Sequence, residues 1–275
     1  MDTPRSFHLH TVSDATGETL AAIAKAARVQ YGQVRAIEHH HPLVRSQREL
    51  ARVIKDIEAS PGIVLYTIFN KELAEELEQS CKALKIPCVP ALQKILQVFE
   101  SYLGTPSTPT VAGQHVLDAD YFRRIEALNF SMLHDDGHLP ENLDDADIIL
   151  VGISRTSKTP TSIYLANRGF KTANVPLVPG VPLPPKLESR TKAFVVGLVA
   201  SADRIAQVRH NRVMEHAHIH LEEYVDREAI AAEVAETRQL CARRGWPIID
   251  VTRRSIEETA AAILRLYQDR DAPAL

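Results

Sequence analysis

Apolar residues alternate along the first hundred positions between short unbroken runs and residues spaced three or four apart. The runs at residues 7–12 and 63–69 predict strands, and the β-branched and aromatic content of the second suits a strand buried on both faces of a parallel sheet. Shorter extended segments are predicted at residues 34–38 and 87–89. The helical spacing predicts four helices, which carry Leu20, Ile23, Ala24 and Ala27, then Leu50, Val53, Ile54 and Ile57, then Leu73, Leu77, Cys81 and Leu84, and finally Leu92, Ile95, Leu96 and Phe99. Four successive strand-helix units predict a compact open α/β sheet.

A segment rich in proline and glycine interrupts this pattern at residues 104–113. Its sequence, Gly-Thr-Pro-Ser-Thr-Pro-Thr-Val-Ala-Gly, opposes regular structure and marks a domain boundary. We therefore predict an N-terminal open parallel-sheet α/β domain at residues 1–104 and a C-terminal P-loop-like α/β domain at residues 105–275. For the second domain the pattern predicts strands at 147–151, 194–199 and 247–251, helices at 118–133, at 227–244 and from Ser255, and a proline-rich loop between Val175 and Pro185.

Charge and composition narrow the function classes. The 275 residues carry 32 basic and 35 acidic side chains, so no overall positive field favours nucleic acid or an anionic membrane, and any phosphate site must be local. The sequence has neither an apolar run of about 20 residues nor the apolar stretch of a secretory signal, so a cytoplasmic protein is expected. Cys81, Cys88 and Cys241 are too few for a disulfide framework and are expected to be reduced and mostly buried.

The most informative segment runs from the predicted strand at 147–151 through a small polar loop to Lys158-Thr159-Pro160. A strand-loop-helix of this kind points backbone amides and the positive end of a helix dipole at one anion, while a lysine reaches outer phosphate oxygens and a threonine hydroxyl ligates magnesium. The residues assigned to nucleotide and phosphate binding are Gly152, Ile153, Ser154, Arg155, Thr156, Ser157, Lys158 and Thr159, with Thr159 also the magnesium ligand.

This loop departs from the usual G-x-x-x-x-G-K-[ST] pattern. Ser157 stands where the second glycine is expected. Arg155 adds a planar cation that matches phosphate oxygens. The alternative interpretation is a surface turn between strand and helix with an incidental Lys-Thr pair.

Longer stretches of the chain resemble one family. They are Gly152 to Pro160 with Ser162 to Ala166 and Ala173 to Gly180, Val12 to Thr19 near the start, Tyr121 to Ala127 and His134 to Gly137 in the middle, and Ile249 to Thr252 with Ile256 to Ala260 near the end. Over nearly its full length the chain is similar to the bacterial and plastid regulatory proteins of pyruvate, phosphate dikinase and phosphoenolpyruvate synthase. The resemblance implies a bifunctional serine/threonine kinase and pyrophosphorylase.

In such an enzyme ADP is the phosphoryl donor for a threonine of the target, and inorganic phosphate removes that group as pyrophosphate. The resemblance implies phosphoenolpyruvate synthase as the protein substrate, with pyruvate, phosphate dikinase as the alternative target. Magnesium is the expected metal, and a homodimer is possible. Two further alternatives stay open: a small-molecule kinase that uses the same loop, and a noncatalytic nucleotide sensor that acts on a partner by binding.

Catalysis of phosphoryl transfer requires in-line positioning and cations on the phosphate oxygens, and a carboxylate that receives the hydroxyl proton is optional. Lys158 and Arg155 are the candidates for the cations. Asp135 and Asp136 are the candidates for the proton-accepting carboxylate, because they lie in a turn shortly before the strand that leads into the loop. One aspartate can serve as the base while the other binds magnesium or caps a turn, and two solvated aspartates without a role are the alternative. A single anion pocket that serves both reactions is our hypothesis.

Four other segments are weaker candidates. Three arginines, Arg204, Arg209 and Arg212, suit a lid or a contact to the target phosphate, although a solvated helix face explains them too. In an extended chain one side would carry His216, His218, His220 and Glu222, but a metal site there is the lesser interpretation. A metal site at the consecutive His39, His40 and His41 is weaker still, because neighbouring residues of a strand point to opposite faces. Ser13 to Thr19 follows the first strand, and we expect a helix start capped by Ser13 or Thr16 rather than a catalytic loop.

Overall fold

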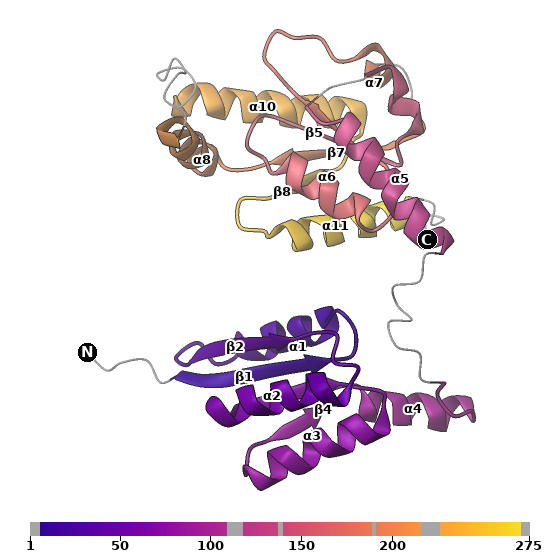
Figure 1. The fold of residues 1–275 in the computed structure, drawn as a ribbon. Helices are drawn as coiled ribbons and strands as arrows, with labels where there is room; N and C mark the ends of the chain where they lie inside the picture. Colours follow the sequence, from indigo (N-terminus) through magenta and orange to yellow (C-terminus); the bar gives the residue numbers. More distant parts are fainter. Residues whose placement is uncertain (1–5, 109–117, 137–139, 189–190, 216–225, 271–275) are drawn as a thin grey trace. The chain divides into compact units, whose positions relative to one another are not determined.

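The computed structural model describes residues 6–108, 118–136, 140–188, 191–215 and 226–270. The chain divides into two compact units, Met1–Val116 and Leu117–Leu275. Each unit contains one four-stranded parallel sheet with helices packed against it (Figure 1). The predicted α/β fold class is therefore confirmed. In these described ranges, no helix is both long and apolar enough to cross a membrane.

The first unit alternates strands and helices. Its elements are β1 (Ser6–Ser13), α1 (Glu18–Arg28), β2 (Arg35–His41), α2 (Gln47–Ala59), β3 (Gly62–Thr67), α3 (Lys71–Ala83), β4 (Cys88–Pro90) and α4 (Gln93–Leu103). The strand order is β2-β1-β3-β4. Helices α2 and α3 lie side by side (Figure 1) and bury Leu50, Ile57 and Leu77 in one core cluster with Val12 and Val64 of the sheet. The four predicted strand-helix units are therefore present.

Helix α4 forms where its spacing predicts it, but its apolar residues remain at the surface of the unit. No residue of α4 is buried, and Val98, Phe99 and Tyr102 are 67, 60 and 89% exposed. Helical periodicity therefore identified the element without showing what its apolar face packs against.

The start of α1 differs from the prediction. Gly17, and not Ser13 or Thr16, occupies the N-cap position, with a φ of 82° in the left-handed region that glycine adopts most easily. The Ser13 hydroxyl instead accepts a hydrogen bond from the Ala15 amide at 3.1 Å, and the buried Asp14 carboxylate accepts one from the Phe69 amide at 2.8 Å. The second contact joins the chain just after β1 to the chain just after β3, which supports a structural role for the segment.

Four histidines of β1 and β2 lie on one face of the first sheet. The Nδ1 atom of His8 lies 2.8 Å from Nε2 of His39, and Nδ1 of His10 lies 3.2 Å from Nε2 of His41. His10 is fully buried and its Nε2 lies 2.8 Å from the Ser60 carbonyl oxygen. The sequence showed the run at residues 39–41 but not its pairing with β1, which depends on the parallel register.

Burial lowers the pKa of both His10 and His41 from the ordinary value of 6.5, although Asp56 of α2 opposes the shift. Both imidazoles therefore favour the neutral form in the folded unit, whereas the unfolded chain takes up their protons as the pH falls below 6.5. The free energy of unfolding must then decrease with acidification and level off below the folded-state pKa values.

We expect the His10→Gln variant to lose less stability than the wild type between pH 7.5 and 5.5, because one buried imidazole no longer disfavours protonation. Urea unfolding at the two pH values measures this difference. His40→Gln, at an exposed histidine of the neighbouring strand β2, controls for the general loss of an imidazole. Equal pH dependence in the wild type and His10→Gln contradicts the argument.

The second unit has the strand order β6-β5-β7-β8. Its elements are α5 (Ala119–Leu133), the 3-10 helix η2 (Pro140–Asp145), β5 (Ile148–Gly152), α6 (Lys158–Ala166), β6 (Thr172–Pro176), α7 (Pro185–Glu188), β7 (Phe194–Val199), α8 (Ala202–Glu215), α10 (Arg227–Arg244), β8 (Ile248–Asp250) and α11 (Ile256–Asp269). Helices α5, α6 and α11 share one face of the sheet, and α10 covers the other (Figure 1). Strand β5 is central and fully buried.

Strand β6 was not predicted, because the sequence between Val175 and Pro185 was interpreted as loop. The observed strand includes Val175 and ends at Pro176, pairs with β5, and buries Ala173 and Val175. Asn174 and Pro176 interrupt its apolar pattern, and an edge strand of a sheet accepts proline more readily than a central strand. The proline-rich loop, residues 177–184, begins only after this strand.

Candidate phosphate-binding site

The predicted phosphate loop connects β5 to α6, as the sequence indicates. Arg155 and Ser157 have positive φ angles of 73° and 60°, and Ser157 is the N-cap residue of α6. The serine therefore adopts the left-handed conformation that the usual second glycine of such loops adopts easily. The first amides of a helix have no acceptor within it, so the start of α6 is suited to an anion.

Gly152 is required at the end of β5 by a close backbone contact. Its φ is 157°, and a Cβ atom there would lie 2.4 Å from the Leu198 carbonyl oxygen and 3.0 Å from the Thr156 hydroxyl. The glycine therefore lets the loop turn directly over β7. Its presence in the sequence motif has a structural reason as well as a functional one.

Lys158 is the first residue of α6 and is only 6% exposed. Its Nζ donates a hydrogen bond to the Ile153 carbonyl oxygen at 3.0 Å, and the Thr156 hydroxyl donates to the same oxygen at 2.9 Å. Burial lowers the pKa of Lys158 to about 8, against the opposing effect of Asp136 and Asp135. The ammonium group is therefore held over the loop in a poorly solvated position, where a charge interacts strongly with a ligand.

Two carboxylates of the turn after α5 lie beside the loop. Asp135 Oδ1 accepts hydrogen bonds from the Thr159 hydroxyl at 3.0 Å and from the Asn174 side-chain amide at 2.5 Å. The Asn174 amide also lies 3.4 Å from Asp136 Oδ1. Asp136 is exposed, and it has a left-handed φ of 51°. The structure thus brings both predicted aspartates to Lys158 and Thr159.

Sequence reasoning did not assign a role to Asn174. This residue is fully buried in β6, opposite Leu150 of β5, and its amide joins the aspartate turn to Thr159 at 3.0 Å. A polar residue at the carboxyl end of an otherwise apolar strand is the signal that could have identified it. It was missed because no strand was predicted at residues 172–176.

The oxygen atoms of Thr159 and Asp135 suit a magnesium ion. Magnesium prefers oxygen ligands in an octahedron with bonds of about 2.0–2.1 Å, which places adjacent ligand oxygens about 2.9 Å apart. The hydrogen bond of 3.0 Å from the Thr159 hydroxyl to Asp135 Oδ1 holds two such oxygens at one point beside the loop. The donor set therefore fits the metal expected from the sequence.

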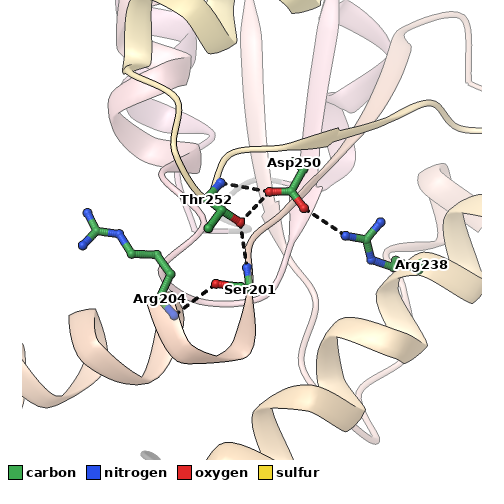
Figure 2. Close-up of polar contacts among 5 residues, drawn as sticks. All are labelled: Ser201, Arg204, Arg238, Asp250 and Thr252. Atoms are coloured by element: carbon green, nitrogen blue, oxygen red, sulfur yellow. Dashed lines mark hydrogen bonds and ion pairs between the residues drawn. The ribbon is translucent and has the colours of Figure 1, made fainter.

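The ends of β7 and β8 form a second polar cluster at the same edge of the sheet (Figure 2). The Ser201 amide donates to the Thr252 hydroxyl at 2.9 Å, Thr252 donates to Asp250, and Arg238 donates to Asp250 at 3.1 Å. The Arg204 amide donates to the Ser201 hydroxyl at 3.3 Å, while its guanidinium group points away from the cluster. This network fixes the chain segments that follow both strands.

The three arginine candidates have different environments. Arg204 is exposed and its guanidinium donates to Gln207 at 3.2 Å. Arg209 is 3% exposed and forms a bidentate ion pair with Glu233 of α10, with distances of 3.1 and 2.7 Å. The geometry of Arg209 therefore indicates a structural link between α8 and α10 rather than a mobile lid. The side chain of Arg212 and the predicted histidine series at His216, His218, His220 and Glu222 lie outside the described residues.

The sequence of this chain matches one family of known proteins. The family described as kinase/pyrophosphorylase matches residues 9–264. A relative from Chelativorans sp. is 60% identical over 267 residues, which cover 97% of this chain and 98% of the relative. Relatives from Sinorhizobium fredii and Bradyrhizobium diazoefficiens are 58 and 56% identical, covering 94 and 96% of this chain and 96 and 95% of their own lengths. All three carry the name pyruvate, phosphate dikinase regulatory protein.

Proposed function

This chain belongs to the kinase/pyrophosphorylase family, and on that premise we propose that it phosphorylates a threonine of its target protein with ADP and removes the group with inorganic phosphate. The observation that carries the proposal is the convergence of Lys158, Thr159, Asp135 and Asp136 on one loop. A buried cation, a helix start and two carboxylates at one point supply what phosphoryl transfer needs.

In the kinase direction, the threonine oxygen of the target attacks the β-phosphorus of ADP. The bond from that phosphorus to the bridging oxygen breaks, AMP leaves, and the hydroxyl proton passes to a carboxylate. Lys158 and the amides at the start of α6 would hold the diphosphate and stabilise the charge on the transferring group. Arg155 supplies a second cation within the same loop.

In the reverse direction, an oxygen of inorganic phosphate attacks the phosphorus of phosphothreonine. The threonine oxygen leaves, takes back a proton, and the product is pyrophosphate. Both reactions move a phosphoryl group between a threonine oxygen and a phosphate oxygen, so one anion site suffices for both. The loop from Gly152 to Thr159 is the site that we propose for both activities.

The two aspartates are proposed to have separate roles. Asp135 shares its Oδ1 with Thr159 and Asn174, which suits a fixed magnesium ligand. Magnesium bound there would neutralise charge on the phosphate oxygens. Asp136 is exposed, so an incoming threonine of a protein reaches it more easily, and we assign it as the base.

Pyruvate, phosphate dikinase is the target that we propose. The name shared by the relatives supports this enzyme rather than phosphoenolpyruvate synthase, which the sequence alone had placed first. No surface formed by the described residues argues for either enzyme, so the choice depends on those names.

Mass spectrometry of the target tests the function. Each candidate enzyme is incubated with this protein and ADP, and phosphate is then added. We expect phosphothreonine on the dikinase with release of AMP, followed by loss of the phosphoryl group with release of pyrophosphate. Transfer from ATP to a metabolite would support a small-molecule kinase, and nucleotide binding without any covalent mark would support a noncatalytic sensor.

A further inference from the structure

A cavity of about 170 Å³ lies next to the phosphate loop in the second unit. Ile153, the first loop residue after Gly152, forms part of its wall. The proline-rich loop forms a second wall with Leu177, Val181 and Leu183, and α10 closes the cavity with Thr237 and Leu240. We infer that this cavity is the subsite for the nucleoside of the phosphoryl donor, an inference that rests on the proposed function.

The chemistry of the walls suits a flat, largely apolar group. Prolines, leucines and valines of the proline-rich loop and Leu240 supply apolar surface, whereas Glu236 and Arg243 contribute charged groups of exposed residues. Ligand pockets commonly combine apolar walls with a few polar groups that orient the ligand. The buried Thr237 is such a polar group within the wall. A base and ribose fit this lining better than another phosphate, because most of the lining residues are apolar.

The position of the cavity also suits in-line transfer. The cavity is lined by α10, which covers one face of the sheet (Figure 1). The aspartate turn contacts Asn174 and Thr159 on the side of α5 and α6, the opposite face. A nucleoside in the cavity therefore places AMP on one side of the loop and the threonine that is deprotonated on the other. Attacking and leaving oxygens roughly in line are what the reaction requires.

The inference predicts different effects on the ligands of the two reactions. ADP carries a nucleoside, whereas inorganic phosphate and pyrophosphate do not. Filling the cavity must weaken ADP binding while the phosphate loop continues to bind pyrophosphate. Gly152, Lys158 and Thr159 stay unchanged in such a variant.

The test is Leu240→Trp, which places a large side chain in the cavity, with calorimetric titration of the full-length protein by ADP and by pyrophosphate. We expect the dissociation constant for ADP to rise about tenfold or more. The constant for pyrophosphate should stay within about twofold of the wild type. Ala235→Trp, at an exposed position of α10 outside the cavity wall, is the matched control and should bind both ligands normally.

Val181→Trp repeats the test from the proline-rich loop, on the other wall of the cavity. The Val181 side chain is 61% exposed, so this variant is expected to fold even if Leu240→Trp does not. Unchanged ADP binding in the folded variants overturns the inference, as does an equal loss of ADP and pyrophosphate binding. Failure of the proposed function has a different signature: the wild-type protein then transfers no phosphoryl group to a protein threonine, whatever the variants bind.

Discussion

The Lys158→Met variant should lose both the ADP-dependent and the phosphate-dependent reaction, each by about 10³-fold in kcat. The reason is that Lys158 is the buried cation of the loop, and methionine keeps its length and packing but not its charge. A charge in this poorly solvated position stabilises the transferring phosphoryl group more than it would in water. Initial rates of AMP and pyrophosphate release measure the two losses.

Loss of folding does not explain such a result. The pKa of Lys158 falls from 10.5 to about 8 in the folded protein, so at neutral pH its charge destabilises the fold by about 3 kcal/mol. Removal of that charge should leave the melting temperature unchanged or raise it. Lys171→Met, at a surface lysine paired with Glu126 in the same unit, is the control and should keep both activities. Loss of only one reaction in Lys158→Met would show that the two activities do not share the loop.

The second large effect is expected for the Asp136→Asn variant, with a decrease of about 10²-fold or more in the kcat of the kinase reaction. Asparagine keeps the shape of the side chain but does not accept the threonine proton. The phosphate-dependent reaction should decrease as well, because the same carboxyl group returns the proton to the leaving threonine oxygen. ADP binding should be nearly unchanged.

Asp135→Asn provides the matched comparison. Because Asp135 shares an oxygen with Thr159, we expect this variant to require more magnesium for half-maximal activity and to recover partly at high magnesium. Asp136→Asn should not recover. If magnesium restores Asp136→Asn instead, the roles of the two aspartates are reversed, and if both variants keep wild-type rates, neither carboxylate acts in catalysis.

The sequence predicted most of the fold because its strands and helices differ clearly in apolar spacing. The central strand β5, the loop after it and α6 follow from an apolar run that ends at Gly152 and from the Lys158-Thr159 pair. Strand β6 was missed because Asn174 and Pro176 disrupt its pattern, and the role of Asn174 was missed with it. Local sequence does not show that this strand pairs with β5.

The histidine pairs and the loop geometry also could not be predicted from local sequence. His8 and His10 meet His39 and His41 only through the parallel register of β1 and β2. That Lys158 is buried follows from packing around α6, which residue spacing does not describe. The contact between Asp135 and Thr159 joins residues 24 positions apart, and the sequence indicated only that the turn lies near the loop.

The binding position of the nucleotide tests the central claim most directly. In a crystal of the full-length protein with ADP and magnesium, we expect the diphosphate against the amides of residues 152–159, with Lys158 on its terminal phosphate and the metal between Thr159 and Asp135. Density for ADP elsewhere, with this loop empty, would contradict the account.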